Sequence, residues 1–335
     1  MFAFRPFYNA TKDKIQFKKV EVPIPEIKEQ DILVKVLAIS VNPADYKIAL
    51  WKKDMPEQNI LGWDVSGIIE KVGNNVKNFK VGDKVFYAGS LIRQGANAEY
   101  HVVDERIVGH MPKSISYKEA AAVPLTALTA YEALFEQLKI SQELNIKPKK
   151  ILLVGAAGGV GSMAIQLLKK LTNCIVIATA SRKESIEWVK SLGADYTIDH
   201  TKSFLSQLNS QGINEVDYTF FINGTEQYFD QIPEIMKPFG RIVAIDDPEN
   251  KLDLMKLKGK SLTFSWELMF THSLYETEDM IKQHHILNKV SQLIDAKKIK
   301  TTLSSDLGMI SEESLEKSHD LLKTGKTIGK IVLTF

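Results

Sequence analysis

Apolar and polar residues alternate along the first third of the chain. In the segment DILVKVLAIS, the apolar residues Ile32, Val34, Val36 and Ala38 share one face, as expected for a half-buried strand. The runs VSGIIEKVG and VGDKVFYAG are bounded by glycine and predict two more strands. Prolines 23 and 25 predict a stiff extended segment. The pattern indicates a β-rich domain, a small barrel, over about the first 120 residues.

From Tyr117 the pattern changes to that of alternating helices and strands. Residues 117–138 are rich in alanine and leucine and predict a helix that Pro124 interrupts. The run ILLV at 151–154 predicts a buried strand, and the next segment has an apolar face at helical spacing: Val160, Met163, Ala164, Leu167, Leu168 and Leu171. Further strand patterns follow in CIVIATA, YTID, VDYTFFI and RIVAI. This alternation predicts βαβ units and a parallel sheet that helices cover on both faces.

The last part of the chain combines a helix with a strand of the first type. A helical pattern covers about residues 276–296, and GKTIGKIVLTF ends the chain as a glycine-punctuated strand. We expect this strand to return to the first domain and complete it. A length of 335 residues is consistent with two domains.

Composition excludes several classes of partner. The formal net charge is +2, so we expect no nucleic acid or acidic membrane as a partner. A single cysteine, Cys174, rules out an intrachain disulfide and favours a cytoplasmic location. The N-terminal residues do not have the pattern of a secretory signal, and no apolar run reaches the ~18 residues that a membrane span needs.

A glycine cluster follows the strand at 151–154 and opens the next helix. It has the spacing of a dinucleotide-binding fingerprint with alanine in place of the first glycine. Small residues let backbone N–H groups approach a pyrophosphate, and the helix N-terminus adds unpaired donors and a positive dipole end. The predicted contacts are Gly155, Ala156, Ala157, Gly158, Gly159, Val160 and Gly161. The alternative is a strand–helix turn that binds nothing.

The residues about twenty positions further on choose between the two nicotinamide cofactors. An NAD site usually has Asp or Glu there, to bind the ribose 2′-hydroxyl. This chain has Ser181, Arg182 and Lys183 instead, which suit a 2′-phosphate and favour NADPH. The alternative is a solvated helix start with Ser181 as its N-cap.

With these residues identified, the whole chain resembles the medium-chain dehydrogenase/reductase superfamily, and within it the quinone oxidoreductase branch. The resemblance is carried by VNPADYK, GWDVSGIIEKVG, AAAVPLTALTAYEAL, LLVGAAGGVGSMAIQLLK, ATASRKESIEWVKSLGADYTIDH and GKTIGKIVL. It implies an α/β fold: a GroES-like β-barrel catalytic domain over 1–122 and 267–335, and a Rossmann doubly wound parallel sheet over 123–266. It also implies a homodimer.

The resemblance implies site residues as well. Asn42, Asp45 and Tyr46 of VNPADYK are expected near the nicotinamide. Further cofactor contacts are expected at Thr126, His200, Asn223, Ile245 and Lys330. His200 stands where relatives often carry tyrosine, so its role stays open.

Zinc members of this family carry Cys or His ligands in the VNPADYK loop and in a GHE motif. Here the loop has no cysteine, and the motif reads GWD, with Trp63 in place of histidine. The seven histidines do not replace these ligands, because His284 and His285 are neighbours on a helix and point about 100° apart. The sequence therefore predicts no bound zinc.

Without a Lewis acid, hydride transfer from NADPH to a quinone, enal or enone is easier than alcohol oxidation. The oxyanion that results needs a proton or hydrogen-bond donors. Tyr46 is the expected donor, directly or through water, unless it only walls the site. Asn42 is expected to orient or donate, and Asp45 to act in catalysis or fix the loop. The aromatic run LTFSWELMF is expected to form the wall of a flat apolar substrate pocket. The alternatives are a core at the junction of the two domains and a dimer contact. A zinc-type alcohol dehydrogenase and a non-catalytic NADPH-binding sensor remain the alternatives.

Overall fold

The computed structural model describes residues 1–9, 11, 14–51 and 60–335. The chain divides into two compact units: unit 1 contains Met1–Leu128 and Phe270–Phe335, and unit 2 contains Thr129–Met269. The domain boundaries expected from the sequence, after residues 122 and 266, lie six and three residues before these divisions.

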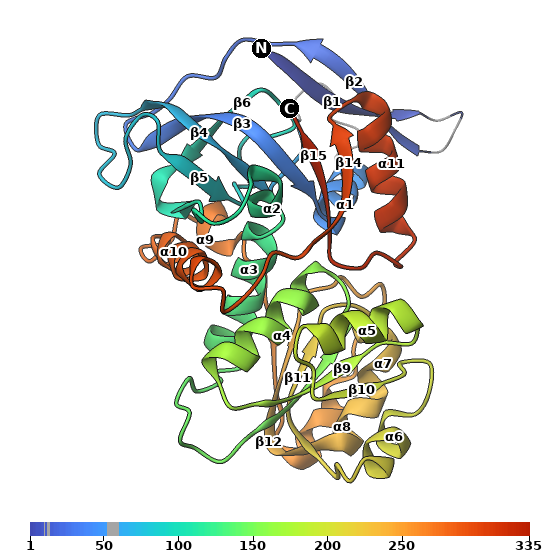
Figure 1. The fold of residues 1–335 in the computed structure, drawn as a ribbon. Coiled ribbons are helices and arrows are strands. Elements are labelled where there is room, and N and C mark those ends of the chain that lie inside the picture. Colours follow the sequence, from blue (N-terminus) through green and yellow to red (C-terminus); the bar gives the residue numbers. More distant parts are fainter. Residues whose placement is uncertain (10, 12–13, 52–59) are drawn as a thin grey trace. The chain divides into compact units, whose positions relative to one another are not determined.

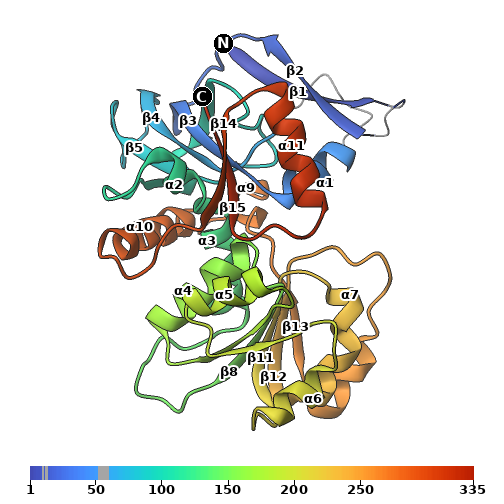
Figure 2. The ribbon, with the colours of Figure 1, turned by 45° about the vertical axis from the view of Figure 1, so that its right-hand side comes forward.

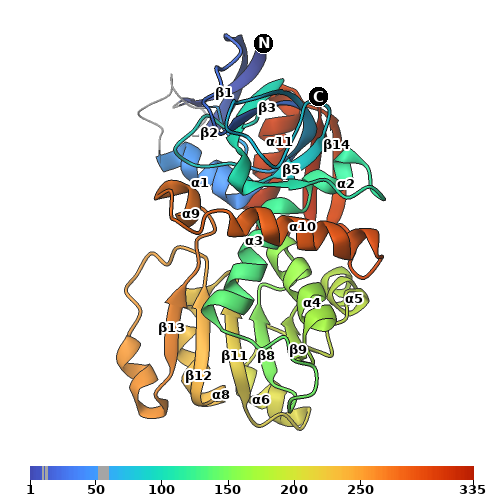
Figure 3. The same ribbon diagram turned by 90° about the vertical axis from the view of Figure 1, so that its left-hand side faces the viewer.

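Unit 2 contains a six-stranded parallel sheet in the order β10-β9-β8-β11-β12-β13. Figure 3 shows β13, β12, β11, β8 and β9 side by side. The strands are β8 (Lys150–Val154), β9 (Ile175–Thr179), β10 (Tyr196–Ile198), β11 (Val216–Phe221), β12 (Met236–Ala244) and β13 (Thr263–Trp266). The order in which strands are added reverses between β8 and β11, since β9 and β10 lie on one side of β8 and β11 to β13 on the other. The carboxyl ends of β8 and β11 therefore form the switch point at which open α/β sheets bind ligands.

Helices cover both faces of this sheet, as the sequence predicts. Figure 2 shows α4 (Gly159–Leu171) and α5 (Lys183–Ser191) on one face, and α6 (Phe204–Ser210) and α7 (Thr225–Tyr228) on the other. The predicted apolar face of α4 is the buried one, since Met163, Ala164, Leu167 and Leu168 are all inaccessible to solvent. The remaining short helices are α8 (Ile232–Ile235), η4 (Phe229–Gln231) and η5 (Leu254–Lys260).

Unit 1 is built on a seven-stranded sheet in the order β14-β15-β3-β4-β5-β7, with β6 also pairing with β3. The strands are β3 (Asp31–Val41), β4 (Val65–Val72), β5 (Lys84–Tyr87), β6 (Tyr100–Asp104), β7 (Val108–His110), β14 (Leu303–Met309) and β15 (Lys330–Thr334). The predicted return of the terminal strand is confirmed, because β15 lies antiparallel to β3. The GroES-like half of the expected fold is therefore completed by the last residues of the chain.

A hairpin and several helices complete unit 1. The hairpin β1 (Phe2–Asn9) and β2 (Lys14–Glu21) lies beside α11 (Glu312–Lys323), as Figure 1 shows. The other helices are α1 (Pro43–Trp51), η2 (Glu105–Ile107), α2 (Tyr117–Ala121), α9 (Thr271–Leu274) and α10 (Lys282–Asp295). Within the described residues, no helix is long and apolar enough to cross a membrane.

The predicted helix over 117–138 is divided into three pieces. A capping box at Ser116 starts α2, α3 (Pro124–Tyr131) begins at the interrupting proline, and a π-helix η3 covers Glu132–Gln137. The division between the two units falls inside α3. Proline at the first position of α3 costs no helical hydrogen bond, which explains why the helix restarts there.

The aromatic run at 262–270 is divided too. Its first half forms β13 at the edge of the unit 2 sheet, where Phe264 packs against the core and Trp266 is exposed. Met269 and Phe270 are buried. The run therefore does not form one continuous aromatic surface.

Candidate functional site

Strand register in unit 1 brings three polar residues together at one end of β3. Val41 lies opposite Ile331 on one side, and Ile39 lies opposite Val65 on the other. Lys330, the first residue of β15, and Asp64, which directly precedes β4, therefore flank Asn42, which directly follows β3.

Lys330 is the cation at the centre of this polar cluster. Its ammonium lies 2.9 Å from a carboxylate oxygen of Asp64, donates to the Val41 carbonyl at 2.9 Å and donates to Asn42 Oδ1. Only 4% of Lys330 is exposed. An ammonium has three N–H donors, and all three are used.

The Asp64 carboxylate is hydrogen-bonded through both of its oxygens. Asn42 Nδ2 donates to Oδ2 at 3.0 Å, and the Leu125 backbone N–H donates to Oδ1 at 2.8 Å. Burial raises the pKa of Asp64, and the Lys330 charge and these donors act against the rise. Asp64 was not among the predicted site residues. Its signal in the sequence was a carboxylate immediately before a buried strand.

The predicted residues Asp45 and Tyr46 lie in the first turn of α1. Asp45 Oδ2 accepts the Asn42 backbone N–H at 2.6 Å, which fixes the start of the helix, while Oδ1 is buried without a donor among the described residues. Burial raises the pKa of Asp45 to about 7, against the opposing effects of the Asn42 N–H and the Lys330 charge. Tyr46 is half-buried beside it.

Asn42 is held more tightly than the sequence suggested. Its Oδ1 accepts from Lys330, and its Nδ2 donates to Asp64 and to the Ser40 carbonyl at 3.3 Å. Both N–H bonds of the amide are therefore taken. The geometry suits the expected orienting role and leaves no amide donor for an oxyanion.

The residues at the expected zinc positions do not fit a zinc ion. Trp63 is 2% exposed, and its indole N–H donates to the Ser90 carbonyl at 3.2 Å, so it offers no lone pair to a metal. The Asn42 carbonyl oxygen faces the Lys330 ammonium. In the described part of the chain, no group of three His, Cys, Asp or Glu side chains is arranged to hold a metal.

In unit 2 the glycine cluster forms a tight turn at the end of β8. Gly155 has φ +84°, and its N–H donates to Thr179 Oγ1 at 3.0 Å, which joins the ends of β8 and β9. Ala156 is fully buried. A Cβ on Gly161 would lie 2.4 Å from the Ala156 carbonyl oxygen, so only glycine allows α4 to pack this close to the turn.

The N-terminus of α4 is open to an anion. Gly158 is the N-cap residue and makes no side-chain cap hydrogen bond, while Ala157, Gly158, Gly159 and Val160 are partly exposed. Uncapped N–H groups at a helix N-terminus attract negative charge. The turn therefore fits the pyrophosphate of a dinucleotide.

Ser181 and Arg182 are both exposed and lie after β9. The alternative is a solvated helix start with Ser181 as its N-cap, and the exposure of these residues agrees with a solvated helix start. Its cap is wrong, because the N-cap residue of α5 is Arg182, whose backbone N–H donates to Ser185 Oγ at 3.2 Å. The Ser181 hydroxyl therefore has no role as the N-cap of α5.

The other predicted cofactor contacts are distributed over both units. Asn223 follows β11 next to the turn, since a Cβ on Gly155 would meet its backbone nitrogen at 3.2 Å, and the Ile245 N–H donates to the Phe221 carbonyl at the same sheet edge. His200 follows β10 with its ring 6.1 Å from that of Tyr228. Thr126 lies in unit 1, in α3, and its hydroxyl donates to the Val123 carbonyl.

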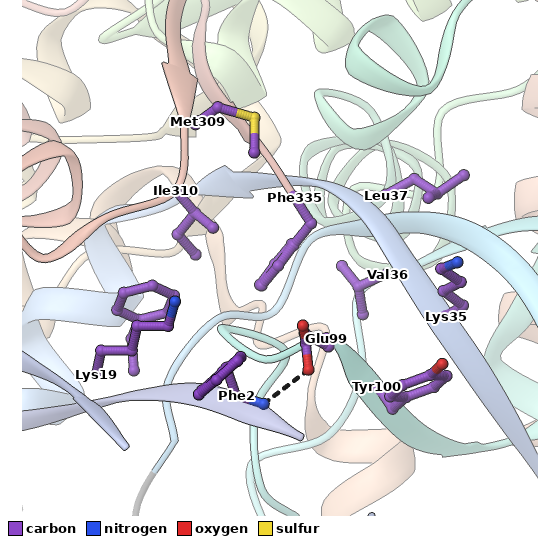
Figure 4. A pocket seen from close by; sticks show the side chains of 11 residues that line it. Phe2, Lys19, Lys35, Val36, Leu37, Glu99, Tyr100, Met309, Ile310 and Phe335 are labelled. Atoms are coloured by element: carbon purple, nitrogen blue, oxygen red, sulfur yellow. Dashed lines mark hydrogen bonds between the residues drawn. The ribbon is translucent and has the colours of Figure 1, made fainter. Parts of the chain in front are cut away.

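A surface pocket of about 400 Å³ lies elsewhere in unit 1 (Figure 4). Phe2, Phe4 and Tyr100 line it together with Lys19 and Lys35. None of the predicted site residues contributes to it, so it is separate from the polar cluster.

Comparison with known proteins identifies the family. Residues 28–113 match the alcohol dehydrogenase GroES-like domain, and residues 159–285 match the zinc-binding dehydrogenase domain. The chain is 41% identical over 318 residues to a zinc-type alcohol dehydrogenase-like protein of Staphylococcus aureus, covering 95% of this chain and 94% of that protein. The chain belongs to the medium-chain dehydrogenase/reductase superfamily, a family of oxidoreductases.

Two further relatives agree with this assignment. A crystal structure of a protein from Rhizobium etli CFN 42, assigned to the zinc-dependent alcohol dehydrogenases, superposes with a TM-score of 0.92 at 40% identity and covers 100% of this chain and 98% of that one. The chloroplastic NADPH-dependent alkenal/one oxidoreductase of Arabidopsis thaliana is 36% identical over 234 residues, covering 67% of this chain and 57% of that protein.

Proposed function

We propose that the protein is an NADPH-dependent oxidoreductase that transfers hydride to a quinone or an α,β-unsaturated carbonyl without zinc. The observation that carries the proposal is the buried Lys330 ammonium among Asn42 and Asp64. A lysine fills the polar cluster that a metal would need, so a reaction that does not depend on Lewis-acid activation of an alcohol is favoured.

The glycine turn and the start of α4 would hold the pyrophosphate of the cofactor through backbone N–H groups. Arg182 would bind a 2′-phosphate with its guanidinium, and Ser181 would add a hydroxyl donor. When bound, the reduced nicotinamide supplies the hydride.

Hydride addition to a quinone or to the β-carbon of an enal leaves a negative charge on the substrate oxygen, and a proton must reach that oxygen or the neighbouring carbon. Tyr46 is the proposed donor, directly or through water, because it lies in the first turn of α1 and is only half-buried. The Asn42 amide has no free N–H for this task.

The substrate class is supported by the name of one relative, since the Arabidopsis protein is an alkenal/one oxidoreductase. The family relationship and the lysine-filled cluster are compatible with that chemistry. The name of the staphylococcal relative, a zinc-type alcohol dehydrogenase-like protein, favours the alternative function of a zinc-type alcohol dehydrogenase.

A steady-state panel tests the proposal. NADPH and NADH are compared with quinones, 2-alkenals and simple alcohols, using the wild type, Arg182→Ala and the control Lys190→Ala at the exposed far end of α5. Loss of one charge-assisted contact should raise the KM for NADPH about tenfold or more in Arg182→Ala, with little change for NADH. Lys190→Ala should behave as the wild type.

Other results would point to the alternatives. Equal effects of Arg182→Ala on both cofactors would refute the 2′-phosphate assignment. Stoichiometric zinc by elemental analysis, with alcohol oxidation, would indicate a zinc-type alcohol dehydrogenase. Tight NADPH binding without turnover of any substrate would indicate a sensor.

A further inference from the structure

The chain places a buried cation beside the helix that carries the expected proton donor. Lys330 contacts Val41, Asn42 and Asp64, and no N–H of its ammonium remains for a cofactor. The expectation that Lys330 binds the cofactor therefore does not account for its position. A different role is needed for a lysine that is only 4% exposed.

Contacts connect this ammonium to the first turn of α1. Lys330 fixes the Asn42 amide through Oδ1, and the Asn42 backbone N–H is in turn bonded to Asp45 Oδ2. The Asp45 backbone N–H donates back to the Asn42 carbonyl at 2.9 Å. Any displacement of Asn42 would therefore move Asp45 and, with it, the adjacent Tyr46.

The charges in this cluster also connect Lys330 to Asp64 and Asp45. Asp64 and Asp45 are both fully buried carboxyl groups, and Lys330 is the cation that acts on both. A buried carboxylate without a cation is expensive, so Lys330 lets Asp64 stay ionised. The Lys330 and Asp64 charges act on Asp45 in opposite directions.

We propose that Lys330 is a positioning residue: its ammonium serves as a fixed internal cation that orients Asn42, pairs with Asp64 and so places the first turn of α1 for proton delivery. This proposal rests on the function proposed above. It assigns Lys330 to the substrate side of the reaction, in unit 1, and not to cofactor binding.

The experiment compares Asp64→Asn, Lys330→Met and the double variant Lys330→Met/Asp64→Asn with the wild type. Lys330→Met leaves Asp64 buried without its cation and is the variant at risk of not folding. The double variant removes both charges and should fold. A matched control, Lys118→Met/Asp306→Asn, removes an exposed Lys–Asp pair of the same unit, whose atoms are 2.6 Å apart.

Two measurements follow. In the double variant, kcat for quinone or enal reduction should fall about tenfold or more while the KM for NADPH stays within about twofold, because the cofactor turn lies in unit 2. By carboxyl-carbon NMR, with Asp45→Asn used for assignment, Asp45 should titrate about one pH unit lower in Asp64→Asn, and correspondingly higher in Lys330→Met if that variant folds. The control should change neither quantity.

Wild-type kcat in the double variant, or an unchanged Asp45 titration in Asp64→Asn, would overturn the proposal. A rise in the KM for NADPH with unchanged kcat would also overturn it, since that is the behaviour of a cofactor contact. If the wild type turns over no substrate at all, the proposed function fails, and the Asp45 titration alone still decides whether the charges of Lys330 and Asp64 control this site.

Discussion

His319 should make unit 1 sensitive to acid. It lies in α11 and is 2% exposed, and neither ring nitrogen has a hydrogen-bond partner among the described residues. Its ring meets Phe17 edge-on, with centroids 5.0 Å apart. Burial lowers the pKa of His319 from its ordinary value of 6.5 to about 4, and the nearby Lys323 charge contributes.

The direction of the effect follows from the two states. The unfolded chain takes up a proton on His319 below about pH 6.5, whereas the folded chain resists protonation until about pH 4. Protonation of His319 therefore favours the unfolded state. The unfolding free energy has its full value above about pH 6.5 and decreases as the pH falls below it. The linkage relation gives a loss of about 2 kcal/mol at pH 5 and about 3 kcal/mol at pH 4.

The test compares the wild type with His319→Leu from pH 8 to pH 4. Urea unfolding followed by hydrogen–deuterium exchange of the α11 peptides reports on unit 1 specifically. The variant should lose less stability in acid than the wild type, by about 2 kcal/mol at pH 5. His285→Leu, which replaces an exposed histidine on α10, should follow the wild type at every pH.

Parallel loss of stability in His319→Leu and the wild type would refute the reasoning. The other buried histidines are present in both proteins, so their contributions cancel in the comparison. A parallel result would mean that the unpartnered imidazole of His319 is protonated in the folded state without cost.

Two further predictions concern unit 2. Gly161→Ala places a methyl group 2.4 Å from the Ala156 carbonyl oxygen, so it should lower the unfolding free energy by about 2 kcal/mol or more and weaken NADPH binding. The control Gly259→Ala should be tolerated, because its methyl group meets nothing within 4 Å. Equal unfolding midpoints and equal NADPH affinities for the two variants would contradict the tight turn. Burial raises the pKa of Glu267 to about 7, against the opposing effect of a hydrogen bond with Glu132, so unit 2 should lose stability as the pH rises from about 4.5 to 7. Glu267→Gln should remove this loss, which the linkage relation puts at about 3 kcal/mol at pH 7. A variant with the same pH dependence as the wild type in urea unfolding would show that the carboxyl is ionised when folded.

The sheet of unit 2 could be predicted because its signals are local. Five strand patterns and the α4 face follow from the spacing of apolar residues, and the glycine turn stands at the boundary between a strand and a helix. The edge strand β13 was missed, because it has only four residues, Thr263–Trp266, and was interpreted as part of a longer aromatic run. The π-helix after α3 also has no sequence signal that separates it from an ordinary helix.

The polar cluster of unit 1 depends on register, which local patterns do not contain. Asn42 and Asp45 are three residues apart and could be found as a motif, but Asp64 and Lys330 come from strands on opposite sides of β3, one of them from the far end of the chain. Their contact requires both pairings to be correct to the residue, because a slip of one position turns every side chain to the other face. A charged residue at the start of a buried strand, either its first residue or the residue directly before it, is the trace of the contact in the sequence. Two such residues of opposite charge, Asp64 and Lys330, are the pattern to look for, since burial of either one requires the other nearby.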